Sequence, residues 1–199
     1  SSTSRGLGDV YKRQGMHPGI NGPKLKDKPA IIMAGSGDII THQELNVLSN
    51  QGAQLFRSLG LKPGDSMAFM MENHKLFFPI AFAAYRSGLK YTAISWRLQA
   101  SEVEYIVKDC GAKVFITSKF LEESAKSLVS SLKGVHKFML DEAIEDFRSY
   151  EEEIGKMPDT PIEDECQGAA MLYSSGTTGK PKGVSREINL SPLPYKADE

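Results

Sequence analysis

The chain has 199 residues, and its 24 lysines and arginines nearly balance its 25 aspartates and glutamates, so the formal net charge is −1. A composition of 40% hydrophobic and 25% charged residues is that of a globular domain, which excludes a disordered tail, a collagen-like repeat and a disulfide-dense secreted scaffold. Because no basic stripe with interleaved aromatic residues is present, we expect no nucleic acid as a partner.

The apolar and cysteine patterns bear on where the protein works. The longest apolar run, from Leu76 to Ala84, has nine residues and contains Pro79, whereas a membrane-spanning helix needs about 20. The two cysteines, Cys110 and Cys166, have no cysteine or histidine at ligand spacing, which speaks against a zinc site or a disulfide framework. Without an apolar signal segment at the start, we expect no transmembrane segment and a cytoplasmic protein.

The first residues differ from the rest of the chain. Residues 1–14 show no periodicity and end in DVYKRQ, which resembles the translation of a transposon end used to prepare sequencing libraries. We expect 1–14 to be a non-native leader; the alternative is a native disordered arm. Without the leader, 21 basic residues face 24 acidic ones and the net charge is −3. The domain is expected over 16–199, with Met16 as a candidate native start.

From Ile31 onward, short apolar runs alternate with helical periodicity, which is typical of βαβ units around a mostly parallel sheet. The expected strands are a hairpin over 31–33 and 39–40, followed by 67–71, 91–94, 113–117, 137–140 and 169–173. The expected helices are 41–60, 75–86, 101–110, 118–132 and 141–154. The acidic stretch 158–167 is expected to be a connecting loop.

Local signals support several of these elements. Thr41 with Glu44, and Ser101 with Glu104, have the spacing of a capping box at a helix start. The uninterrupted apolar strand 67–71 belongs in the middle of the sheet, where both faces are buried. If Pro79 lies in the interior of helix 75–86, it is expected to remove one hydrogen bond, at a cost of about 3 kcal/mol, or to kink the helix.

The fold class follows from the alternation. Right-handed crossovers between parallel strands place helices on both faces of the sheet. We therefore expect an α/β domain with a mostly parallel sheet and helices on both faces, without an internal repeat.

One segment has the residue types of an anion-binding loop. The ten residues 174–183 that follow strand 169–173 contain three glycines, four hydroxyl side chains and two lysines. Glycines let backbone N–H groups converge on an anion, hydroxyls add donors and lysines add charge, so the segment suits a polyphosphate. It is not a Walker A loop, because Pro181 stands where a serine or threonine is needed. The alternative is a Ser/Gly/Thr surface turn.

The string YSSGTTGKPKG over 173–183 resembles the phosphate-binding signature of the adenylate-forming (AMP-binding) superfamily, which includes acyl-CoA synthetases, firefly luciferase and the adenylation domains of peptide synthetases. The resemblance extends upstream to THQEL at 41–45 and GLKPGD at 60–65. The stretches SWRL at 95–98 and CGAK at 110–113 are similar to fatty-acyl-CoA ligases. The resemblance as a whole covers roughly residues 31–183.

The resemblance implies a two-step reaction. A carboxylate, first of all a fatty acid, attacks the α-phosphorus of ATP to give an acyl-adenylate and pyrophosphate, and the thiol of coenzyme A then displaces AMP. The loop would bind the β- and γ-phosphates, and Lys182 would be the catalytic residue that supplies charge. The cofactor-binding candidates are Ser174, Ser175, Gly176, Thr177, Thr178, Gly179 and Lys182.

The remaining partners follow from the same resemblance. Mg²⁺ accompanies such phosphates. We assign no residue of this chain as a metal ligand, because the four histidines, His17, His42, His74 and His136, are scattered without ligand spacing. A homo-oligomer is compatible with the sequence, and an open sheet edge would favour self-association.

Parts of the family's pattern lie beyond this sequence. These are the Thr-Glu motif that binds magnesium, the acidic residue for the ribose, the hinge, the C-terminal domain with its lysine and most of the acyl pocket. We therefore expect an N-terminal fragment of an ATP-dependent acyl-CoA ligase that is inactive alone. The alternatives are an adenylation domain of another adenylate-forming enzyme and a non-catalytic nucleotide-binding scaffold; a Walker-type ATPase is disfavoured by Pro181.

Overall fold

The computed structural model describes residues 17–174, 182–185, 188 and 193. The expected leader, 1–14, and residues 175–181 of the expected phosphate loop lie outside the described residues. The helices are α2 (Pro18–Leu25), α3 (His42–Ser58), α4 (Phe77–Arg86), α5 (Ala100–Asp109), the 3-10 turn η1 (Lys119–Leu121), α6 (Glu122–Leu128) and α7 (Tyr150–Gly155). The strands are β1 (Pro29–Ile32), β2 (Ile39–Thr41), β3 (Ser66–Met70), β4 (Lys90–Ile94), β5 (Ala112–Ser118), β6 (His136–Leu140), β7 (Arg148–Ser149), β8 (Ala169–Ser174) and β9 (Lys182–Ser185).

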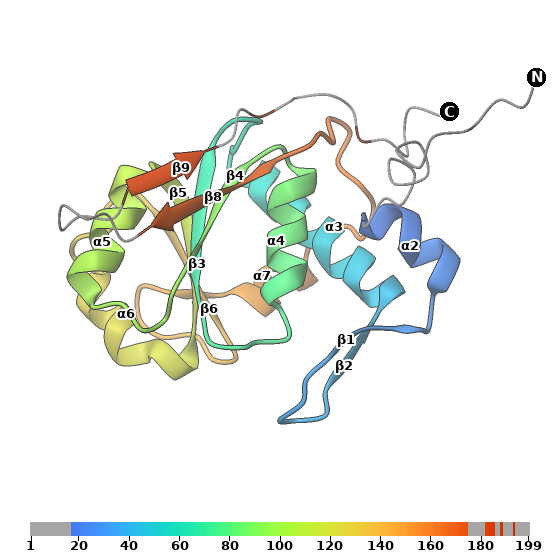
Figure 1. The fold of residues 1–199 in the computed structure, drawn as a ribbon, viewed down its shortest axis with the longest axis horizontal. Helices are drawn as coiled ribbons and strands as arrows, with labels where there is room; N and C mark the ends of the chain where they lie inside the picture. The colour runs from blue at the N-terminus through green and yellow to red at the C-terminus, as the bar shows by residue number, and fades with distance from the viewer. Residues whose placement is uncertain (1–16, 175–181, 186–187, 189–192, 194–199) are drawn as a thin grey trace, which may run out of the picture.

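The strands form two sheets (Figure 1). β1 and β2 make the predicted antiparallel hairpin. The other seven strands form one sheet in the order β7-β6-β5-β3-β4-β8-β9, parallel throughout except for the antiparallel pair β8–β9. β3 lies in the middle, as its uninterrupted apolar sequence predicts.

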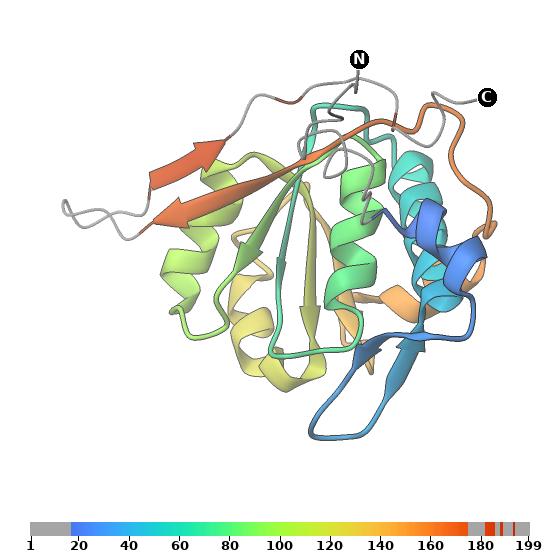
Figure 2. The same ribbon diagram turned by 45° about the vertical axis from the view of Figure 1, so that its right-hand side comes forward.

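Helices cover both faces of the large sheet, which confirms the predicted α/β class (Figures 1 and 2). Alternate residues of β3 enter two separate cores, because successive side chains of a strand point to opposite faces. Met67 and Phe69 pack into the core shared with α3, α4 and α7. Ala68 and Met70 pack into the core shared with α5 and α6. Among the described residues, no helix is both long and apolar enough to cross a membrane.

The starts of α3 and α4 show how local chemistry sets helix boundaries. Thr41 Oγ1 accepts from the Glu44 N–H at 3.2 Å, and Glu44 Oε2 accepts from the Thr41 N–H at 2.7 Å, so this predicted capping box is confirmed. α4 begins at Phe77, two residues later than predicted, and Pro79 is its third residue. Because the N–H groups of a first turn have no partner within the helix, Pro79 removes no helical hydrogen bond. The cost predicted for a proline in the helix interior therefore does not arise at Pro79.

Two other helix predictions need smaller corrections. α5 begins at Ala100, and Glu102 Oε2 accepts from the N–H of Gln99 at 2.9 Å, so the capping box predicted at Ser101 and Glu104 is wrong. The helix predicted over 118–132 is shorter, because residue 118 pairs with β6 and continues β5. The helical residues there are those of η1 and α6.

The acidic helix predicted over 141–154 is wrong in its first half. Phe147 packs against Phe115 in the core on the α5–α6 side, whereas Tyr150 packs against Phe138 in the core on the opposite side. A single helix cannot bury both side chains, because the segment crosses the edge of the sheet between them. The chain instead forms β7 and then the short helix α7.

Candidate phosphate-binding site

The predicted phosphate loop is closed by a β-hairpin. β8 and β9 pair antiparallel, and the last pair of their register joins Ser174 to Lys182. The structure thus brings the first and last predicted loop residues together, and Lys182 is exposed. The other site residues that the sequence predicts, Ser175, Gly176, Thr177, Thr178 and Gly179, lie outside the described residues.

Beyond Ala170, the β8–β9 hairpin pairs with no other strand among the described residues. Only Ala169 and Ala170 of β8 pair with β4 within the described residues, and from Met171 onward β8 pairs with β9. Residues 171–174 and 182–185 form a two-stranded ribbon that continues beside α5 (Figures 1 and 2). Leu172 and Val184 on the ribbon are 65% and 61% exposed, whereas Met171 and Tyr173 pack against the core on the α5–α6 side.

A hydrogen bond links this ribbon to α5. The Tyr173 hydroxyl donates to Oδ2 of Asp109, the last residue of α5, at 2.6 Å, and the Tyr105 hydroxyl donates to Oδ1 at 3.4 Å. Burial, together with the hydrogen bond to Asp109, raises the pKa of Tyr173 far above its ordinary value. The Tyr173 hydroxyl therefore stays protonated and remains a donor.

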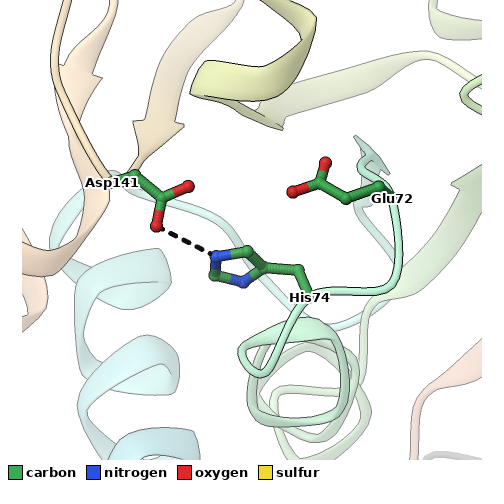
Figure 3. A group of neighbouring side chains, drawn as sticks. All are labelled: Glu72, His74 and Asp141. Carbon is green, nitrogen blue, oxygen red and sulfur yellow. Dashed lines mark hydrogen bonds and ion pairs between the residues drawn. The ribbon is translucent and has the colours of Figure 1, made fainter. Parts of the chain in front are cut away.

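A second polar group lies where the strand order reverses. The chain leaves β3 for β4 on one side and later returns to β5 on the other, and the carboxyl ends at such a switch point are where open α/β sheets bind ligands. Across this point the Ser118 hydroxyl donates to Oε2 of Glu72. Glu72, His74 and Asp141 lie within one group whose ligand atoms are all within 4.8 Å of one another (Figure 3).

The hydrogen bonds of His74 decide what this group can do. Its Nδ1 accepts from the Leu76 N–H at 3.1 Å, so in the neutral ring the proton is on Nε2, which donates to Asp141 Oδ1 at 3.2 Å. Metal ligation would need the lone pair of Nε2. The geometry therefore favours a histidine–carboxylate hydrogen bond over metal binding. The His74 side chain is only 9% exposed.

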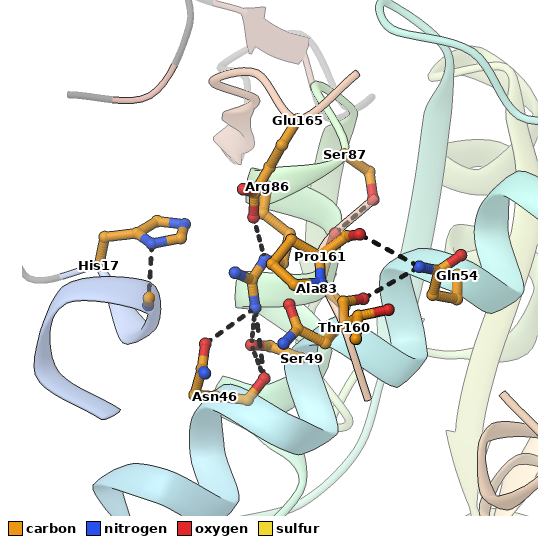
Figure 4. Close-up of polar contacts among 12 residues, drawn as sticks. His17, Asn46, Ser49, Gln54, Ala83, Arg86, Ser87, Thr160, Pro161 and Glu165 are labelled. Atoms are coloured by element: carbon orange, nitrogen blue, oxygen red, sulfur yellow. Dashed lines mark hydrogen bonds and ion pairs between the residues drawn. The ribbon is translucent and has the colours of Figure 1, made fainter. Parts of the chain in front are cut away.

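The segment before β8 is held by a buried ion pair (Figure 4). Arg86 Nε donates to Oε1 of Glu165, and neither side chain has exposed surface. Nη1 of Arg86 also donates to the Ser49 hydroxyl at 2.8 Å. The stretch 158–167 contains no helix or named strand, as predicted. It is attached to α4 through Glu165 and to α3 through Asn50, whose Nδ2 donates to the Asp159 carbonyl oxygen at 2.6 Å.

The residue types of the predicted loop suit a nucleoside triphosphate, because they supply hydrogen-bond donors and positive charge. Hydroxyls, glycine N–H groups and the exposed ammonium of Lys182 all donate to anions, and Ser174 and Lys182 lie opposite each other at the mouth of the loop. Among the described residues, the carboxylates of Glu72 and Asp141 accept hydrogen bonds from Ser118 and His74, respectively.

Sequence reasoning missed three of these features: Asp109–Tyr173, Arg86–Glu165 and the group around His74. Two of them have a signal in the sequence. Asp109 places a negative charge at a helix C-terminus, where the helix dipole disfavours it. Arg86 ends a helix whose other residues are almost all apolar, which indicates a buried partner.

Comparison with known proteins agrees with this geometry. The family model described as AMP-binding enzyme matches residues 21–189. The fatty acid–[acyl-carrier-protein] ligase ScoC of Streptomyces coeruleorubidus is 30% identical over 164 residues, which are 78% of this chain and 29% of that protein. A feruloyl-CoA synthase of an Amycolatopsis species is 30% identical over 158 residues, or 78% of this chain and 30% of the synthase.

A solved structure is similar in fold as well. The inhibitor-bound N-terminal domain of FACL13 from Mycobacterium tuberculosis superimposes with a TM-score of 0.74 at 26% identity, covering 85% of this chain and 42% of that one. The chain spans about three tenths of the length of these two curated relatives. Because the family model matches well over half of the residues, the chain belongs to the AMP-binding enzyme family.

Proposed function

We propose that this chain is the N-terminal part of an ATP-dependent acyl-CoA ligase that activates a carboxylic acid, with a fatty acid as the first candidate. The observation that carries the proposal is the β8–β9 hairpin, which places Ser174 and Lys182 at the two ends of the signature loop. In this proposal residues 16–199 belong to the AMP-binding domain and 1–14 do not. The family match beginning at residue 21 supports that division.

The proposed chemistry assigns a task to each group of the loop. The hydroxyls and N–H groups of residues 174–179 bind the β- and γ-phosphates of ATP. When a carboxylate oxygen attacks the α-phosphorus, the bond to pyrophosphate breaks and negative charge grows on the leaving group. Lys182 compensates that charge, because a preorganised cation stabilises the transition state more than the ground state. Mg²⁺ would supply further positive charge to the phosphates.

The nature of the acid and of the acceptor thiol is proposed from the relatives. ScoC is named a fatty acid ligase and the synthase is named for feruloyl-CoA, so a fatty acid and an aromatic acid are the two classes to compare. ScoC is named for an acyl-carrier protein, which favours a carrier-bound thiol as a second candidate acceptor besides coenzyme A. We also propose a cytoplasmic location, supported by two buried free cysteines.

Acid-dependent exchange of labelled pyrophosphate into ATP by the full-length enzyme tests this function. We expect exchange with a saturated fatty acid, weaker exchange with ferulate, and thioester formation on adding coenzyme A. Exchange with amino acids alone would favour a peptide-synthetase adenylation domain. ATP binding without exchange for any acid would favour a non-catalytic scaffold. The 199-residue chain alone is expected to give no acyl-adenylate.

A further inference from the structure

The ribbon that carries the signature loop has little support from the sheet. Met171 to Ser174 pair with β9 rather than with β4 within the described part of the chain, and β9 is the edge strand. A two-stranded ribbon is marginally stable by itself. Its direction, and so the positions of Ser174 and Lys182, must be set by side chains that contact the rest of the domain.

Tyr173 makes such a contact. It precedes Ser174 directly, its ring packs against the core on the α5–α6 side, and its hydroxyl donates to Asp109 Oδ2 at 2.6 Å. The two residues are 64 positions apart in the sequence, so the hydrogen bond joins the ribbon to a separate helix.

Gly183, the register partner of Tyr173, makes this contact sterically feasible. A Cβ atom at Gly183 would lie 2.9 Å from Tyr173 Cζ and 3.0 Å from its hydroxyl oxygen. The ring therefore crosses over the backbone of β9 on its way to Asp109, and only a glycine leaves room for it. Tyr173, Gly183 and Asp109 thus form one connected arrangement.

Asp109 is otherwise poorly placed. It is the last residue of α5, where the helix dipole disfavours a carboxylate. A residue that breaks a local rule in this way is commonly retained for a contact made elsewhere. Here that contact is with Tyr105 in its own helix and with Tyr173 in the ribbon.

From this geometry we infer that Tyr173 and Asp109 are a positioning pair that fixes the β8–β9 ribbon for nucleotide binding. The inference rests on the proposed function, because it assigns the ribbon's ends to the phosphates of ATP. Small displacements of binding groups are costly in a site that depends on preorganised donors. The pair does not touch the reacting atoms; it acts through Ser174 and Lys182.

The test compares Tyr173→Phe, Asp109→Ala and their double variant in the full-length enzyme. Tyr105→Phe is the matched control, since it removes a hydroxyl from the same carboxylate but belongs to α5 itself and not to the ribbon. We expect Tyr173→Phe and Asp109→Ala each to raise the KM for ATP in pyrophosphate exchange about tenfold, the scale of one lost charge-assisted hydrogen bond. The double variant should be no worse than either single one, and the KM for the acid and the melting temperature should stay at the wild-type values.

Three results would overturn the inference: an unchanged KM for ATP in Tyr173→Phe, an equal rise in the KM for the acid, or the same effect from Tyr105→Phe. A wild-type enzyme without any acid-dependent exchange would instead contradict the proposed function. In that case the amide hydrogen exchange of residues 171–174 and 182–185 in the 199-residue chain still tests whether Tyr173 and Asp109 fix the ribbon. It must be faster in Tyr173→Phe than in Tyr105→Phe, and equal rates would refute the pair.

Discussion

Arg86 and Glu165 form an ion pair with no exposed side-chain surface, although 79 residues separate them in the sequence. The pair joins the end of α4 to the segment that leads into β8. Nη1 of Arg86 also donates to Ser49 at 2.8 Å, so the guanidinium holds three parts of the chain together (Figure 4). Because β8 carries the signature loop, the start of the ribbon depends on this buried contact.

Replacing Glu165 by Gln is expected to destabilise the domain by about 3–5 kcal/mol, because a buried guanidinium loses its charged partner. Asp164→Asn is the control, since Asp164 pairs with Arg57 but its side chain is 54% exposed; it should cost less than about 1 kcal/mol. Urea unfolding of the 199-residue chain measures both. Equal costs for the two variants would contradict the assigned importance of the buried pair.

Gly168 lies just before β8, where two backbones approach closely. A Cβ atom there would be 2.4 Å from the Leu89 carbonyl oxygen and 3.0 Å from the Ala84 carbonyl oxygen, and backbone cannot move away cheaply. We expect Gly168→Ala to cost about 1–3 kcal/mol of unfolding free energy. Gly155→Ala, at the end of α7 with no atom within 4 Å, should instead stabilise by up to about 1 kcal/mol. A Gly168→Ala variant as stable as wild type would show that β8 is not packed as described.

Tyr150 should make the domain sensitive to alkali. Its side chain is buried, its hydroxyl has no hydrogen-bond partner among the residues that the structure describes, and burial raises its pKa well above the ordinary value. The folded-state pKa of Tyr150 lies above the unfolded value of about 10. The resulting stability is fully present below pH 10, and it is lost as the pH rises from there through the folded-state pKa.

Tyr150→Phe is therefore expected to stabilise the chain by about 1 kcal/mol near neutral pH, because an unpaired buried hydroxyl is removed. Above pH 10 the advantage should grow by up to about 1.4 kcal/mol per pH unit. Urea unfolding on both sides of that pH gives the comparison. A constant difference between variant and wild type would mean that Tyr150 does not contribute to the alkaline loss of stability.

Lys182 is exposed at the end of the loop, so its removal should affect chemistry and not folding. In the full-length enzyme we expect Lys182→Ala to lower the rate of pyrophosphate exchange at least about 100-fold, the scale of one lost donor to developing negative charge. Lys133→Ala, at another exposed lysine, is the control and should exchange at the wild-type rate. Undiminished exchange in Lys182→Ala would remove that residue from the proposed mechanism.

Features set by neighbouring residues could be predicted from the sequence. The capping box of Thr41 and Glu44, the hairpin before it and the central place of β3 all follow from patterns within a few residues. The signature at 173–183 likewise identified the family, because its meaning lies in consecutive residues.

Features set by the packing of distant elements could not be predicted. The contacts Arg86–Glu165 and Tyr173–Asp109 span 79 and 64 residues, and no local pattern pairs their members. The acidic segment 141–154 is predicted as one surface helix. Its apolar residues instead lie on opposite faces of the sheet, which only the position of the sheet edge decides.

The central claim is that the carboxylate attacks the α-phosphorus of ATP, and an isotope experiment tests it directly. The full-length enzyme is given ATP, coenzyme A and a fatty acid labelled with ¹⁸O in its carboxylate, and the products are analysed by mass spectrometry. The account predicts one ¹⁸O atom in AMP, because thiolysis leaves the attacking oxygen on the phosphate. Label in inorganic phosphate, with ADP as the other product, would contradict it.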